Sequence, residues 1–81
     1  MTQHIARTEK QLGAILRRAR KQAGLTQSSL GNLRQGTVSR LEAGAPAIQL
    51  HTLMEALAAL NLELVIRPRS KASPADIEGL F

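Results

Sequence analysis

The sequence has 81 residues and no cysteine, and its eleven Lys and Arg against six Asp and Glu give a formal net charge of +5. A chain of this length forms one small domain with a marginal core, to which oligomerisation often adds stability; without cysteine it builds neither a disulfide framework nor a Cys-based zinc module. Phe81 is the single aromatic residue, and no apolar run approaches the length of a membrane span, which excludes aromatic base-stacking platforms and transmembrane classes.

The first predicted element is a helix over about residues 9–22, preceded by a flexible N-terminus at residues 1–7. Thr8 and Gln11 match a capping box, in which the two side chains reciprocally satisfy backbone donors at the helix start. Gly24 stands where a C-terminal cap belongs. Apolar residues recur on one face at helical spacing: Leu12, Ile15, Leu16, Ala19 and Ala23. The opposite face is basic and carries Arg17, Arg18, Arg20 and Lys21.

A short second helix is predicted after Thr26, which is a good N-cap. Leu30 and Leu33 are its apolar pair. Gly31 weakens this helix, because glycine in a helix interior costs about 1 kcal/mol relative to alanine.

A third short helix is predicted over about residues 35–43, with Val38 and Leu41 facing inward. It ends at Gly44-Ala45-Pro46, because proline cannot continue a helix and disfavours helical geometry in the residue before it.

The fourth predicted helix has the most regular apolar stripe, which serves as core or as core and dimer seam: Leu50, Leu53, Leu57 and Leu60, with Met54 and Ala58 beside them. Asn61 can end this helix in the left-handed conformation. Residues 62–67 then alternate with period two and predict a β-strand, closed by Pro68.

A single strand leaves its backbone donors and acceptors unpaired. Pairing with the same strand of a second copy would satisfy them in a two-fold dimer, and an extended segment lying on its own helices is the alternative. The residues expected to make the dimer contact are Leu62, Leu64, Val65 and Ile66. The predicted fold class is therefore all-α with one C-terminal β-strand.

Three regions are expected: residues 1–7, one folded domain over residues 8–69 that includes the dimer contact, and a disordered C-terminal tail over residues 70–81. The tail ends in the apolar residues Ile77, Leu80 and Phe81. They either fray, as termini usually do, or form a docking or degradation signal.

Positive charge is concentrated in the first half of the chain. Residues 1–40 hold eight bases and one acid, whereas residues 41–81 hold three bases and five acids. This asymmetry favours a polyanionic partner for the first half. Arg17, Arg18 and Lys21 are candidate phosphate contacts, although a solvated helix face is the simpler interpretation of a charge run.

Two short helices with polar starts, following a longer helix, are typical of a helix-turn-helix. The segments Leu25-Thr26-Gln27-Ser28-Ser29-Leu30 and Gln35-Gly36-Thr37-Val38-Ser39-Arg40-Leu41-Glu42 resemble the two helices of the lambda-repressor-like (Xre) family. The continuation through residues 57–69 resembles HipB-type antitoxins. This resemblance covers most of residues 8–69. It implies a homodimeric repressor that binds an inverted-repeat operator in double-stranded DNA, together with a HipA-like Ser/Thr kinase toxin as partner.

The resemblance also implies which residues face DNA. Arg34 could form a bidentate contact with guanine and Gln35 with adenine, each worth roughly 1–3 kcal/mol of discrimination. Gly36 would permit close backbone approach, and Gln27 matches a phosphate-binding position. The full set of expected DNA contacts is Gln27, Ser28, Arg34, Gln35, Gly36, Thr37, Ser39 and Arg40.

The spacing within this motif departs from the family. Leu30 and Val38 are eight positions apart, whereas the corresponding residues of the family are usually eleven positions apart. Either the second helix is stunted and the recognition helix docks almost normally, or the recognition helix is displaced. Displacement would favour a toxin-binding scaffold with weakened DNA readout; a stand-alone Xre-type repressor without a toxin is a further alternative.

Catalytic chemistry has no basis in the sequence. Asp76 is the only aspartate, no Ser/His/Asp spacing resembles a triad, and His4 and His51 are isolated from one another and from other metal ligands. We therefore expect a non-enzymatic protein without metal or cofactor. Residues 1–7 contain no apolar run typical of a secretory signal, so the expected location is cytoplasmic and nucleoid-associated.

Overall fold

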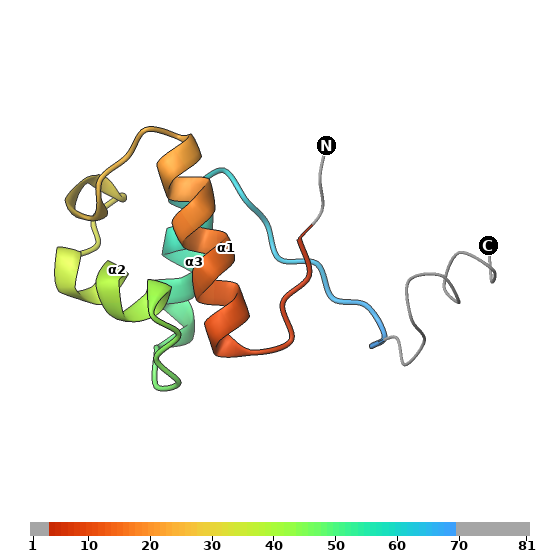
Figure 1. Cartoon of the computed structure of the whole chain (residues 1–81). Helices are drawn as coiled ribbons and strands as arrows, with labels where there is room; N and C mark the ends of the chain where they lie inside the picture. The colour runs from red at the N-terminus through yellow and green to blue at the C-terminus, as the bar shows by residue number, and fades with distance from the viewer. Residues whose placement is uncertain (1–3, 70–81) are drawn as a thin grey trace.

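The computed structural model describes residues 4–69, which contain three α-helices and one 3-10 turn (Figure 1). Their order along the chain is α1 (Glu9–Gln22), η1 (Gln27–Ser29), α2 (Gln35–Glu42) and α3 (Leu50–Ala59). In Figure 1, α1 crosses in front of α3, and α2 lies to one side of both. None of the helices is long and apolar enough to cross a membrane within the part of the chain described.

The start of α1 confirms half of the predicted capping box. The Thr8 hydroxyl accepts a hydrogen bond from the Gln11 backbone N–H at 3.1 Å. The Gln11 side-chain oxygen, however, accepts from the backbone N–H of Arg7 at 2.7 Å, one residue before the N-cap. At the other end, Gly24 takes the left-handed conformation with φ +74°, as the C-cap prediction required.

The second predicted helix is reduced to one turn. η1 contains three residues, and Leu30 after it is extended. Gly31 then reverses the chain with φ +56°, a conformation that glycine adopts without steric cost. Leu30 and Leu33 therefore lie outside any helix, contrary to the prediction, although Leu30 is fully buried and Leu33 packs against the core.

The predicted third and fourth helices are confirmed as α2 and α3. Asn61 lies just after α3 in the left-handed conformation, with φ +56°, and Gly44 lies just after α2 with φ +83°. One face of each helix reaches a shared core, whose buried apolar residues are Leu16, Leu30, Val38, Leu41, Ala56 and Leu57. The expected stripe on α3 divides, because Leu50 and Met54 remain 69% and 46% exposed.

Two glycines allow α1 and the end of α2 to touch through their backbones. A Cβ on Gly13 would lie 2.5 Å from the carbonyl oxygen of Glu42 and 2.6 Å from that of Leu41. A Cβ on Gly44 would lie 2.6 Å from the Cα of Lys10. Because both contacts involve main-chain atoms, no side chain larger than hydrogen fits either position without moving a helix.

No strand is present in residues 4–69. Residues 62–69 form an exposed segment without regular secondary structure, which runs away from the helices in Figure 1. A strand is defined by its hydrogen-bonded neighbour, and one copy of the chain offers none here. The shared strand and the dimer therefore stay predictions, and the predicted disordered tail at residues 70–81 lies outside the described residues.

Candidate nucleic-acid interface

The candidate recognition surface is the outer face of α2 and its N-cap. Val38 and Leu41 point into the core, so the helical repeat turns the intervening residues outward. Thr37 is half-buried, and the other predicted contacts on this element are exposed: Arg34, Gln35, Gly36, Ser39 and Arg40. The structure thus gathers six of the predicted DNA-binding residues on one short helix and its cap.

Gly36 has no structural reason to be glycine within the described chain. A Cβ built there would meet no heavy atom within 4 Å, and its φ is not left-handed. The openness of this position agrees with the predicted close approach of a ligand backbone but does not require it.

The turn η1 presents a group of hydroxyls beside Gln27. Thr26 and Ser29 form the capping box of this turn, with the Thr26 backbone N–H donating to the Ser29 hydroxyl at 2.9 Å. The Thr26 hydroxyl lies 3.0 Å from that of Ser29 and 3.2 Å from that of Ser28. These short-range bonds give η1 a defined shape although it is only one turn long.

A buried ion pair joins α1 to the end of α2. Arg20 Nε donates to Glu42 Oε2 at 2.6 Å, and Arg20 Nη2 donates to Glu42 Oε1 at 3.1 Å. The two side chains are only 9% and 4% exposed. Arg20 was expected on the solvated basic face of the first helix; the structure corrects this, because its guanidinium turns inward to the carboxylate.

The same network reaches the turn η1 and the segment just before it. Arg20 Nη1 donates to the backbone oxygen of Leu25 at 2.8 Å, just before η1. Gln27 Nε2 donates to Glu42 Oε1 at 3.2 Å. One carboxylate therefore links α1 to η1 and α2, the two elements of the predicted helix-turn-helix.

Both pKa values in this pair move toward the charged forms. Burial raises the pKa of Glu42, but hydrogen bonds from Arg20 and Gln27 and the charges of Arg20 and Arg17 outweigh it, and the net pKa is lowered. The hydrogen bond to Glu42 raises the pKa of Arg20 against the opposing effect of burial. Both groups are consequently charged at neutral pH.

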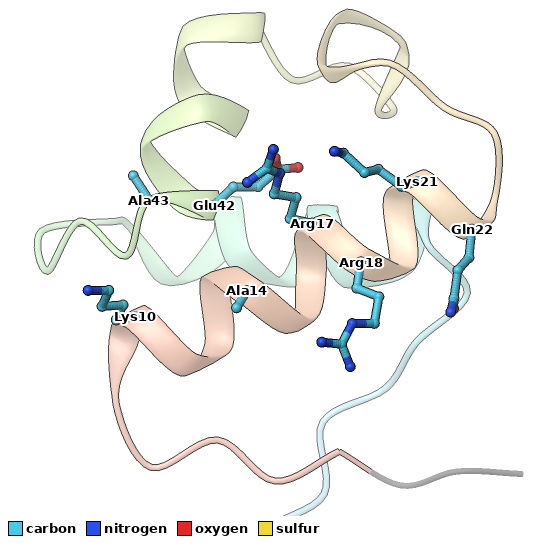
Figure 2. A pocket seen from close by; sticks show the side chains of 8 residues that line it. All are labelled: Lys10, Ala14, Arg17, Arg18, Lys21, Gln22, Glu42 and Ala43. Carbon is cyan, nitrogen blue, oxygen red and sulfur yellow. The ribbon is translucent and has the colours of Figure 1, made fainter.

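An open, cationic groove runs along α1 beside the end of α2 (Figure 2). Arg17 and Lys21 extend toward the α2 side of α1, whereas Arg18 extends to the other side. The remaining lining residues are Lys10, Ala14, Gln22, Glu42 and Ala43. Because Arg17 acts on the same carboxylate that Gln27 contacts, these two predicted phosphate-binding residues lie near one another.

Sequence reasoning missed Arg20 and Glu42 as partners. They are 22 positions apart, and Arg20 is one of four basic residues among five consecutive positions. Nothing in the sequence distinguishes Arg20 from the other three. One available signal was Glu42, the only acid between Glu9 and Glu55, at the end of a predicted helix.

The fold and this surface are those of a helix-turn-helix protein. A family model described as helix-turn-helix matches residues 16–66, and the chain belongs to this family, of the Xre-like kind. No curated protein matches the sequence.

Solved structures of HipB share the fold. The chain resembles HipB in the HipA–HipB–O2–O3 complex with a TM-score of 0.74, and HipB in the O4 20mer complex with a TM-score of 0.75. In both comparisons the identity is 28%, over 85% of this chain and 100% of the HipB chain.

The second predicted helix is stunted, as one of the two alternatives required, while the docking of the third on DNA stays a prediction. η1 is stunted, while Leu30 and Val38 are 1% and 0% exposed and share one core. The likeness to HipB extends over the whole HipB chain despite the shorter element. α2 therefore keeps its buried face although the second element forms only one turn.

Proposed function

We propose that this protein is a HipB-type antitoxin that represses transcription as a homodimer. In this proposal residues 8–69 bind an inverted-repeat operator in nucleoid DNA of the cytoplasm, and the dimer also binds a HipA-like Ser/Thr kinase toxin. The observation that carries the proposal is the match to the entire HipB chain at 28% identity, in complexes that contain operator DNA and HipA.

The exposed face of α2 is the proposed reader of base edges. Arg34 and Gln35 stand at its start, where a recognition helix brings side chains to the major groove. Thr37, Ser39 and Arg40 continue the polar surface and contact bases or phosphates. Each good bidentate base contact discriminates by about 1–3 kcal/mol, which makes Gln35 the clearest residue to test.

The phosphate contacts are assigned to η1 and α1. Gln27 and Ser28 lie on η1, and Arg17 and Lys21 extend from α1 on the α2 side. Arg18 points to the other side of α1, so its contribution is expected to be smaller. These contacts would bind all duplexes alike, since they involve no base edges.

Electrophoretic and fluorescence-anisotropy titrations with the chain's own promoter fragment test the DNA-binding role. Affinity for the operator should fall with salt, with a log–log slope of about 0.9 per neutralised phosphate. Arg17→Ala or Lys21→Ala should each reduce that slope by about 0.9, while Arg69→Ala, which removes one charge outside the helices, should leave it unchanged.

Gln35→Ala tests base readout. It should reduce the ratio of operator affinity to random-duplex affinity by about tenfold. Equal affinity of the wild-type protein for both duplexes at every salt concentration would contradict the repressor assignment.

The dimer is assigned to the segment after α3. Leu64, Val65 and Ile66 are 50%, 72% and 89% exposed in a single copy, and Leu62 is 36% exposed. Burying these side chains against a second copy would remove apolar surface from water and pair the backbone of both segments. Val65→Pro removes one backbone donor and is expected to yield monomers in light scattering; a dimer of unchanged affinity would contradict this assignment.

A toxin-binding scaffold without sequence readout is the second candidate. It is favoured by one observation, the reduction of η1 to three residues. Co-purification from the native operon, followed by footprinting, separates the two: a kinase complex with no footprint supports the scaffold. A native operon that encodes no HipA-like protein would instead support a stand-alone repressor.

A further inference from the structure

The side chain of Gln27 is held by a buried acid, unlike the exposed polar residues of α2. Its Nε2 donates to Glu42 Oε1 at 3.2 Å, and the same oxygen accepts from Arg20 Nη2 at 3.1 Å. Glu42 is fixed in turn by the 2.6 Å bond from Arg20 Nε to its other oxygen. Gln27 itself is half-buried, so part of the residue remains accessible to a ligand.

The chemistry of the carboxylate determines the orientation of this amide. An ionised carboxylate only accepts hydrogen bonds, so Gln27 must turn its NH₂ group toward Glu42. Phosphate oxygens are also acceptors only. The second N–H of the same nitrogen can therefore donate to a phosphate, whereas the reversed amide would offer a carbonyl oxygen that repels it.

Arg20 offsets the negative charge that Glu42 would otherwise present to a phosphate bound by Gln27. Without it, the negative charge of Glu42 would oppose a phosphate held by the neighbouring amide. The guanidinium neutralises that charge, and its third hydrogen bond, to the Leu25 oxygen at 2.8 Å, fixes the chain just before η1. The same residue thus compensates the charge and places the turn.

We infer that Arg20 and Glu42 are positioning residues for DNA binding, which hold the Gln27 amide and the turn η1 in the orientation that donates to a phosphate. Neither side chain contacts DNA in this arrangement. The inference rests on the proposed function and deepens it, because it assigns the affinity contributed by Gln27 to a network inside the protein.

A double-mutant cycle tests this assignment. The probe is a 20-base-pair duplex that the wild-type dimer selects from a randomised library, with an unselected duplex beside it. Arg20→Met combined with Glu42→Leu removes both charges while filling their space, a replacement that buried ion pairs often tolerate. Thermal unfolding of each variant confirms that the protein measured is folded.

The expected result is a loss of coupling. Gln27→Ala should weaken binding about tenfold in the wild-type background, as expected for a charge-assisted hydrogen bond. In the Met/Leu background, the starting affinity should already be about tenfold lower, and Gln27→Ala should change it by less than about twofold. If Arg20 and Glu42 only stabilised the fold, their replacement would lower the fraction of folded, binding-competent protein, and Gln27→Ala would still weaken binding by the same factor. An equal loss of affinity on Gln27→Ala in both backgrounds therefore overturns the inference.

A second variant keeps the test decisive if the double replacement does not fold. Glu42→Gln preserves side-chain size but can both donate and accept, so it no longer dictates the orientation of Gln27. The effect of Gln27→Ala should then be smaller than in the wild-type protein; an undiminished effect overturns the inference. Failure of the wild-type protein to select any duplex would instead overturn the proposed function, and this inference with it.

Discussion

Because the backbones of α1 and α2 touch at Gly13 but not at Gly36, replacing each glycine by alanine should change stability in opposite directions. Gly13→Ala places a methyl group 2.5 Å from the Glu42 carbonyl oxygen and 2.8 Å from its carbonyl carbon, where contacts below 3.0 Å are essentially never seen. Gly36→Ala adds the same methyl group to α2, where no heavy atom lies within 4 Å.

The size of each effect follows from two opposing contributions. Alanine is favoured over glycine in a helix interior by about 1 kcal/mol. At Gly36 nothing opposes the gain, although this residue lies in the first turn of α2 and realises only part of the interior value. At Gly13 the methyl group forces α1 away from the end of α2, and overpacking costs about 1–3 kcal/mol, with the upper end expected because the obstacle is main chain. The net result at Gly13 is a loss of about 2 kcal/mol.

Thermal and urea unfolding followed by circular dichroism measure both variants. In a domain of this size, 1 kcal/mol shifts Tm by roughly 4–8 °C. Gly13→Ala should therefore lower Tm by about 8–16 °C, and Gly36→Ala should raise it by at most about 4–8 °C. All samples need one protein concentration, because association stabilises the folded state by mass action. A Tm for Gly13→Ala at or above that of the wild-type protein would refute the packing argument.

Three further predictions concern stability. Glu42→Gln should destabilise the protein by about 2–3 kcal/mol at pH 7, somewhat less than the loss of one partner from a fully buried ion pair. Because folding lowers the pKa of Glu42, the stability advantage of the wild-type protein is full above about pH 4.3 and is lost as the pH falls through the lowered folded-state pKa. The urea midpoints of the two proteins should therefore converge on acidification. Thr8→Ala removes the acceptor of the Gln11 N–H and should cost about 1 kcal/mol in urea unfolding, whereas Thr8→Ser should cost far less. Leu30→Ala should cost about 2–4 kcal/mol and Leu33→Ala distinctly less, because only Leu30 is fully buried; equal losses would show that the turn after η1 is not fixed as described.

Local sequence signals determined the long elements and the outward face of the site. The Thr8 cap, the left-handed Asn61 and the apolar spacing of Val38 and Leu41 each act over a few residues, so their consequences could be predicted without the fold. The same period that buried Val38 also exposed the polar positions of α2. A short-range rule therefore sufficed to predict which residues of that helix face solvent.

Contacts between distant segments were decided only by the tertiary structure. Nothing local distinguishes Arg20 from its basic neighbours, yet packing of α1 against α2 brings Glu42 within 2.6 Å and makes Arg20 the buried one. Gly13 likewise carries no turn or cap signal, and its importance arises from two carbonyl groups that approach from another helix. The stunted η1 is a third case, because the core fixes Leu30 and Val38 in place and the few residues between them cannot also complete a helix. Composition and charge determined the class of partner to expect, whereas the placement of the groups that would meet it depends on how helices far apart in the chain come together.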